Sequence, residues 1–560
     1  MSTKTHKVFR FVFIFFLLYW IVSTIYWGID NFSISGQDTP NHLLFSLEFY
    51  RALLSSLSKG GLKIFEMVGL LFKPMPHSAG RYTNLTYLIT APYYHIFGSN
   101  LAAARLSNIP ALALLIISVY FISKEFAGKS AGMLSVLFLL FNPLIFESSR
   151  QYGVDLFLAA FAGLSVLLLI RFEGFIGPKA IIWGLVSGIG IFFKPYIMIY
   201  LGPPALVYLF FNIKNSEDKK RVVLHFISAS LVILFFILVW LFKNFPSFKW
   251  YAAGKNQVKY LPYFFRSFLL STAGWTALIF FIPGLKKIIK DNKPSGYTIL
   301  LWVGVPLILL AWLFGFKWHT DRYFLSMVPA IAVASAVGAF SFKRKIRIPL
   351  IAFSLLYLSG QYTYLTFSSG EDCKNIDEME YQDYFKFQKY GLINPSSYTV
   401  GYAKGDPSGL KEVIDFINQD CSEANNQEII GVSLVCQGPK PFEVRYRFSA
   451  VSPIYDYLDY SQMPHSTHSV LKYCSPNYLI FKLKSASIED LIPDYTSFTE
   501  RVKESMILAN RLMYMYAVRE DIREEKFHLF SNLYETTELV KEIEACEISW
   551  RIYKVKEEEE

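Results

Sequence analysis

The chain has 560 residues, of which 53% are hydrophobic and 17% aromatic, and its mean hydropathy is +0.31. This composition excludes an ordinary soluble protein, because soluble domains contain fewer apolar residues. The net charge of +10 is unevenly divided: residues 366–560 hold 33 acidic and 21 basic side chains, whereas residues 1–365 hold 12 and 34. A basic membrane region followed by an acidic outer region explains this division without a nucleic-acid partner.

The N-terminal segment predicts a retained membrane anchor. Three basic residues accompany an apolar run at residues 8–22, and no small-residue cleavage site follows it. If the basic end stays in the cytoplasm, the chain after Trp27 emerges on the outer side of the membrane. Amphipathic stretches at residues 43–57 and 82–97 then predict helices that lie in the membrane interface.

Ten further apolar runs bring the expected number of membrane spans to about eleven. These runs are residues 101–122, 131–146, 156–170, 181–193, 197–211, 222–242, 268–282, 299–314, 324–340 and 348–364. Alternation places the five basic connecting loops in the cytoplasm, as the positive-inside rule requires. The predicted fold is therefore mainly α, a polytopic transmembrane helix bundle over residues 1–365.

Residues 366–560 predict a soluble α/β domain on the outer side of the membrane. Periodicity predicts helices at 409–418 and 533–543, and strands at 428–435, 478–483 and 549–555. All five cysteines lie in this region, where they could form two disulfides in an oxidising compartment or remain reduced. No zinc-type Cys/His spacing occurs, and no metal or other cofactor is predicted, although the acidic residues leave a divalent metal open as an alternative.

Acidic side chains near a membrane are costly to bury and are therefore candidates for function. Asp38 lies in a turn between a glycine and a proline, where its carboxylate could act as a general base on an acceptor hydroxyl. It could equally cap a helix that begins at Asn41. Asp155 immediately precedes an apolar run, and it could be functional, cap that helix or pair with Arg150.

Basic residues on the predicted outer side are candidates for binding a lipid phosphate, and they are Arg81, Lys194 and Arg322. Each could instead be an interfacial anchor, because each neighbours a tyrosine or tryptophan. Residues near these charges are assigned to the donor and acceptor cavity, namely His42, Tyr82 and His319. The sequence has no glycine-rich phosphate loop, so a lipid-linked donor suits this topology better than cytosolic ATP.

The pattern resembles the GT-C superfamily of membrane glycosyltransferases, in particular the protein O-mannosyltransferase and lipid A aminoarabinose transferase branch. The resemblance rests on Asp38, the tyrosine-rich stretch 82–87 leading to 96–98 and 104–106, Asp155, and residues 321–324 with Pro329. It implies that Asp38 is the catalytic base or positions the acceptor, that Asp155 is a second essential acid, and that Arg81 and Arg322 contact the lipid phosphate. The chain departs from many relatives in having Asp-Thr at 38–39 and Gly-Arg-Tyr at 80–82.

The resemblance implies an enzyme that moves a hexosyl or pentosyl group from a polyprenyl-phosphate donor to a hydroxyl of a glycan, lipid or protein, with inversion. It also implies a multi-pass protein of the bacterial inner (plasma) membrane, with a cytoplasmic N-terminus and a periplasmic or extracellular C-terminal domain. Two alternatives remain open. A transporter or flippase would show internal repeats, which this sequence lacks, and a non-catalytic glycan-assembly protein would tolerate loss of Asp38.

Overall fold

The computed structural model describes residues 3–30, 39–58, 69–72, 83–172, 177–252, 268–313 and 321–367, the residues 412–413, 415–416 and 419, and five strands. The chain divides into two compact units. The first consists of Met1–Ile29, Phe45–Ser368 and Tyr384–Val400, and the second of Asp30–Leu44, Ser369–Asp383 and Gly401–Glu560. The predicted domain boundary between residues 365 and 366 stays a prediction, because the second unit also includes a segment near the N-terminus.

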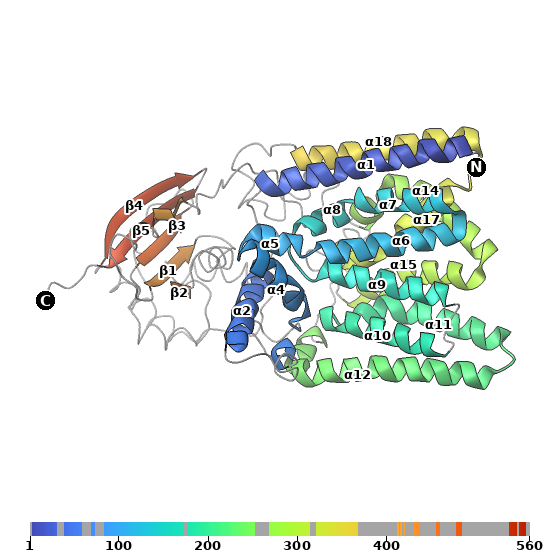
Figure 1. Ribbon diagram of the computed structural model, residues 1–560, viewed down its shortest axis with the longest axis horizontal. Helices are drawn as coiled ribbons and strands as arrows, with labels where there is room; N and C mark the ends of the chain where they lie inside the picture. Colours follow the sequence, from blue (N-terminus) through green and yellow to red (C-terminus); the bar gives the residue numbers. More distant parts are fainter. Residues whose placement is uncertain are drawn as a thin grey trace. The chain divides into compact units, whose positions relative to one another are not determined.

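Helices make up the first unit (Figure 1). In chain order they are α1 (Thr3–Asp30), α2 (Thr39–Ser58, which begins in the second unit), α4 (Leu85–Phe97), α5 (Leu101–Leu106), α6 (Ile109–Ala127), α7 (Lys129–Leu140), α8 (Pro143–Arg150), α9 (Asp155–Arg171), α10 (Pro178–Phe193), α11 (Ile197–Asn215), α12 (Lys219–Ala252), the π-helix η2 (Phe268–Ala273), α14 (Gly274–Asp291), α15 (Lys293–Leu313), α16 (Asp321–Phe324), the 3-10 helix η3 (Leu325–Met327), α17 (Val328–Ala339) and α18 (Arg344–Phe367). The predicted helical bundle is confirmed.

Within the described residues, six helical segments are long and apolar enough to cross a membrane. They are Phe9–Gly28, Leu101–Ala127, Ile197–Asn215, Lys219–Phe242, Lys293–Ala311 and Arg322–Ala339, and the bent pair of α7 and α8 would make a seventh. This number is below the predicted eleven. Among the remaining helices, α9 has 17 residues and α10 has 16, fewer than the roughly 20 that cross the hydrocarbon core without distortion.

Glycines allow two helices of the bundle to touch through their backbones. A Cβ atom at Gly284 of α14 would lie 1.8 Å from the carbonyl oxygen of Ala334 in α17, and one at Gly338 would lie 1.9 Å from the carbonyl oxygen of Phe280. Small residues at helix interfaces are typical of membrane bundles, where close van der Waals packing drives association. The helix α17 is consequently buried along its whole length.

The predicted interfacial segments are helical, as expected. They form α2 and α4, which are joined by a buried hydrogen bond of 2.8 Å between the hydroxyls of Ser46 and Tyr94. At the edge of the bundle, α1 lies beside α18 (Figure 1), and the Tyr362 hydroxyl lies 2.7 Å from that of Ser23. These contacts join segments that are distant in sequence.

The second unit contains a mixed sheet with the strand order β2-β1-β3-β5-β4. Its described strands are β1 (Ile430–Cys436), β2 (Tyr455–Asp459), β3 (Tyr478–Leu483), β4 (Thr537–Ala545) and β5 (Ile548–Val555). β1 pairs in parallel with β2 and β3, whereas β5 pairs antiparallel with β3 and β4. The predicted strands at 428–435, 478–483 and 549–555 correspond to β1, β3 and β5. Of the predicted helix at 409–418, residues 412–413 and 415–416 are described, and these are helical.

The predicted helix at residues 533–543 is wrong, because its described part belongs to strand β4. The sequence there is rich in Glu, Lys and Leu, which favour helices. Pairing with β5 overrides that local preference by satisfying the backbone and burying Ile543 opposite Trp550. The register shifts between Leu539 and Lys541, which is a β-bulge that obscures the alternation expected of a strand.

Candidate active site

Three segments of the bundle carry the candidate site, namely the α8–α9 connection, the α10–α11 connection and helix α16. Asp155 is the first residue of α9, and Val154 is the N-cap of that helix. Lys194 follows the last residue of α10 and has an extended backbone with φ −155° and ψ 130°. Pro195 comes next, and because a proline disfavours the helical conformation of the residue before it, α10 ends here and turns Lys194 inward. Tyr196 then leads into α11.

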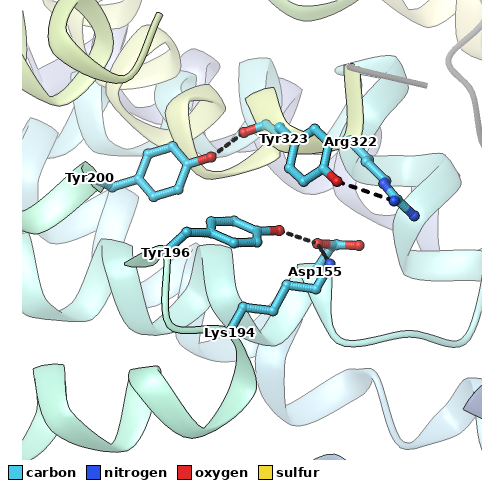
Figure 2. Close-up of polar contacts among 6 residues, drawn as sticks. All are labelled: Asp155, Lys194, Tyr196, Tyr200, Arg322 and Tyr323. Carbon is cyan, nitrogen blue, oxygen red and sulfur yellow. Dashed lines mark hydrogen bonds and ion pairs between the residues drawn. The ribbon is translucent and has the colours of Figure 1, made fainter. Parts of the chain in front are cut away.

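A buried ion pair joins the first two connections. The Nζ atom of Lys194 lies 2.6 Å from Oδ1 of Asp155, and the side chains are 2% and 11% exposed. The hydroxyl of Tyr196 donates a hydrogen bond of 3.2 Å to the same carboxylate oxygen (Figure 2). The positive end of the α9 dipole adds to this stabilisation of the carboxylate. A buried charge pair is maintained only while both partners remain, since loss of one leaves an uncompensated charge.

Residues of α16 form the facing side of the site. Nη2 of Arg322 donates a hydrogen bond of 3.3 Å to the Tyr323 hydroxyl, and its guanidinium lies 5.1 Å from the centre of that ring. The Tyr200 hydroxyl donates to the Tyr323 carbonyl, and the rings of Tyr196 and Tyr323 meet edge to face at 5.6 Å. Figure 2 shows the Tyr323 hydroxyl and the Asp155 carboxylate on facing sides of this group.

The electrostatics keep the Tyr196 hydroxyl protonated. Burial raises the pKa of Tyr196 well above its usual value, and the neighbouring Asp155 carboxylate raises it further, while Arg322 acts in the opposite direction. A neutral phenol remains a hydrogen-bond donor throughout the physiological pH range. The site therefore combines two cations, one carboxylate and phenolic donors, which is chemistry suited to holding an anionic group such as phosphate.

The structure brings together three of the residues predicted from the sequence, Asp155, Lys194 and Arg322. Two alternatives considered for them are wrong. Asp155 pairs with Lys194 and not with Arg150, whose Nη2 instead donates to Thr366 Oγ1 at 2.9 Å. Lys194 is not an interfacial anchor reaching for water, because it is almost completely buried.

Other predicted site residues are placed only in part. His42 is described and lies buried on α2. The remaining ones, Asp38, Arg81, Tyr82 and His319, lie outside the described residues. Among the residues that are described, no group of three His, Cys, Asp or Glu side chains could hold a metal ion.

Sequence reasoning gave no role to Tyr196 or Tyr323. Each follows a candidate cation closely, in Lys194-Pro195-Tyr196 and in Arg322-Tyr323. This adjacency to a candidate cation is the sequence feature that could have pointed to a role for the two tyrosines in the site. Their mutual contact joins residues that are more than a hundred positions apart, and local patterns do not reveal it.

Comparison with known proteins shows what this chain resembles. Residues 84–242, which include Asp155 and Lys194, match the family model described as dolichyl-phosphate-mannose-protein mannosyltransferase. The crystal structure of ArnT from Cupriavidus metallidurans bound to undecaprenyl phosphate is similar with a TM-score of 0.57, at 14% sequence identity, over 88% of this chain and 95% of that chain. The chain has an ArnT-like fold. The apo state of the same ArnT gives the same values.

A weaker similarity extends to a second protein of known structure. The archaeal oligosaccharyltransferase AglB from Archaeoglobus fulgidus has a TM-score of 0.44 at 11% identity, covering 89% of this chain and 72% of that chain, and it adds nothing to the fold assignment. No curated protein matches the chain significantly. The family match over residues 84–242 and the ArnT-like fold confirm the predicted GT-C resemblance.

Proposed function

We propose that the protein transfers a sugar from a polyprenyl-phosphate donor to an acceptor hydroxyl on the outer side of a membrane. The observation that carries this proposal is the buried cluster of Lys194, Asp155 and Tyr196, with Arg322 on its facing side. The family match supports a glycosyl transfer from a lipid-linked donor. The related ArnT binds undecaprenyl phosphate, a lipid phosphate of the class proposed for this donor.

Lys194 and Arg322 are the proposed ligands of the donor phosphate, together with Arg81. Asp155 holds the Lys194 amine in place before the donor arrives, so the amine need not be ordered during binding. The developing charge on the leaving phosphate is then stabilised by fixed cations in a site from which water is largely excluded. The Tyr196 hydroxyl completes this arrangement by donating a second hydrogen bond to the Asp155 carboxylate.

Asp38 is the proposed general base. The acceptor oxygen attacks the anomeric carbon and forms the new glycosidic bond while its proton passes to the Asp38 carboxylate. The bond from the anomeric carbon to the phosphate oxygen breaks, and the polyprenyl phosphate leaves with the electron pair. A single displacement of this kind inverts the anomeric configuration. His42, Tyr82 and His319 are proposed to line the space for the sugar and the acceptor.

The sugar is proposed to be a hexose or a pentose, and the acceptor a glycan, lipid or protein. The proposed location is the bacterial inner (plasma) membrane, with the N-terminus in the cytoplasm and residues 366–560 in the periplasm or outside the cell. Basic loops that alternate with apolar runs support this orientation.

The test is sugar transfer by membranes that carry the wild-type chain or a variant at equal expression. A mixed pool of radiolabelled polyprenyl-phosphate sugars is supplied, and label is scored in protein, lipid and polysaccharide fractions. We expect Asp38→Asn to lower transfer at least a hundredfold. Asp291→Asn is the matched control, because Asp291 is half-exposed and pairs with Lys287 one helical turn away.

Each outcome decides a separate part of the proposal. The fraction that carries label identifies the acceptor class, and the sugar that is consumed identifies the donor. Equal transfer by wild type and Asp38→Asn would remove Asp38 as the base. Absence of transfer by the wild-type chain from every donor would refute the proposed function and favour a transporter or an assembly protein.

A further inference from the structure

The segment directly before Asp155 is held by buried polar contacts that the proposed reaction does not use. Residues 151–154 connect α8 to α9, and within them Gln151 and Tyr152 are 3% and 1% exposed. Connecting segments normally run over the surface, where water satisfies their backbone groups. A buried connection needs partners from the protein instead.

Asn108 supplies the first of these partners. Its Nδ2 donates to the carbonyl oxygen of Ser149 at 3.2 Å and to that of Gln151 at 2.7 Å. Asn108 is the N-cap of α6, a position where an asparagine side chain commonly bonds to its own helix, yet it makes no such cap here. Its side chain is directed instead at the end of α8 and the start of the connection.

Tyr152, which lies within the connection, provides the second anchor by bonding to a different helix. Its hydroxyl lies 2.8 Å from Oγ1 of Thr90 in α4, and Thr90 in turn lies 3.0 Å from the hydroxyl of Ser107. Burial raises the pKa of the Tyr152 hydroxyl, with a further contribution from Tyr94, so the hydroxyl stays neutral and the bond is retained. The connection is thus held to α4 as well as to α6.

We propose that Asn108 and Tyr152 are positioning residues for Asp155. Asp155 follows Tyr152 by three residues, so these contacts fix where α9 begins and place the carboxylate 2.6 Å from the Lys194 amine. Without Asn108 the Gln151 carbonyl would lose this donor, and without the Tyr152 hydroxyl the bond to Thr90 would be lost, so the connection would shift to recover hydrogen bonds. A displacement of about 1 Å in an active site can cost roughly a hundredfold in rate.

The first test needs no substrate. In the wild-type, Asn108→Ala, Tyr152→Phe and Tyr208→Phe backgrounds, thermal unfolding midpoints are measured for Asp155→Asn, Lys194→Met and the double variant. The coupling of the ion pair is the midpoint shift of the double variant minus the sum of the shifts of the two single variants. Tyr208→Phe is the matched control, because the buried Tyr208 hydroxyl makes a 2.8 Å hydrogen bond to Ser295 that joins α11 to α15.

We expect the coupling shift to fall by at least half in the Asn108→Ala and Tyr152→Phe backgrounds and to stay unchanged in Tyr208→Phe. Equal coupling in all four backgrounds would overturn the positioning role. A loss of coupling in the control as large as in the other two would overturn it as well, because the effect would then follow from general loosening of the bundle.

The second test links the anchors to the proposed function, on which this part of the inference rests. We expect Asn108→Ala and Tyr152→Phe to lower kcat/KM for the donor at least tenfold, with Tyr208→Phe near wild type. In an Asp155→Asn background, adding Asn108→Ala should change the Kd for polyprenyl phosphate less than twofold. A change as large as in the wild-type background would overturn action through Asp155. If the wild-type chain transfers no sugar, the proposed function fails, while the unfolding cycle still decides the positioning role.

Discussion

Replacement of Lys194 by methionine tests the buried ion pair directly. The substitution keeps the length of the side chain and removes its charge, so packing changes little. Asp155, whose side chain is 11% exposed, would retain the hydrogen bond of 3.2 Å from Tyr196 and lose the cation at 2.6 Å. Breaking a buried pair in this way costs about 3–5 kcal/mol, which is a large share of the roughly 5–15 kcal/mol that stabilises a typical domain.

The assay is thermal unfolding in detergent, followed by intrinsic tryptophan fluorescence. We expect Lys194→Met to lower the midpoint by several degrees and the double variant with Asp155→Asn to recover most of the loss, because no charge then remains buried. A single variant as stable as wild type would refute the buried pair. The double variant should still fail in sugar transfer, since the proposed phosphate ligand is missing. Transfer at the wild-type rate would exclude Lys194 from that role.

Three further changes probe other parts of the molecule. Gly338→Leu should destabilise the bundle by about 1–3 kcal/mol or abolish folding, because its Cβ would meet the backbone of α14. Gly304→Ala is the control, because nothing lies within 4 Å of a Cβ at that position. Equal expression and equal unfolding midpoints of the two variants would contradict the described contact. The free energy of unfolding should fall as pH rises above about 10, because tyrosines of the unfolded chain ionise there while burial keeps Tyr196 protonated in the folded state. Tyr196→Phe should reduce this fall. A pH profile that the substitution leaves unchanged would be the contrary result. Tyr323→Phe removes the hydroxyl to which Arg322 donates and should raise the donor KM about tenfold with little effect on the unfolding midpoint, whereas an unchanged KM would exclude this contact from donor binding.

Much of the helical unit could be predicted from the sequence, because the helices of a membrane bundle have long apolar sequences. Residues 222–242, for example, lie wholly within α12. The number of crossings is harder to predict. Short helices such as α9 and α10 are apolar and lie near the lower limit of a full span, and apolarity alone does not show whether they cross.

At the candidate site, local sequence patterns predict the charged residues but not the contacts between them. Asp155, Lys194 and Arg322 could be chosen because charge is rare in an apolar chain. Their pairing could not, since Asp155 meets a lysine 39 positions away and not the nearby Arg150. The predicted helix at residues 533–543 was wrong for a related reason, because pairing of β4 with β5 outweighs the helical preference of its own residues.

The uneven packing of the bundle has a consequence for the lipid around it. Within their apolar windows, the N-terminal span and the span in α12 are only 17% buried, whereas the span that carries Arg322 is 89% buried. When a bilayer is thinner or thicker than the apolar length of a helix, the helix adapts by tilting. The two exposed helices should adapt in this way more readily than α17, whose backbone packs closely against α14 at Gly284 and Gly338. Changes in membrane thickness should therefore be absorbed at the rim and leave the spacing of the central charged residues unchanged.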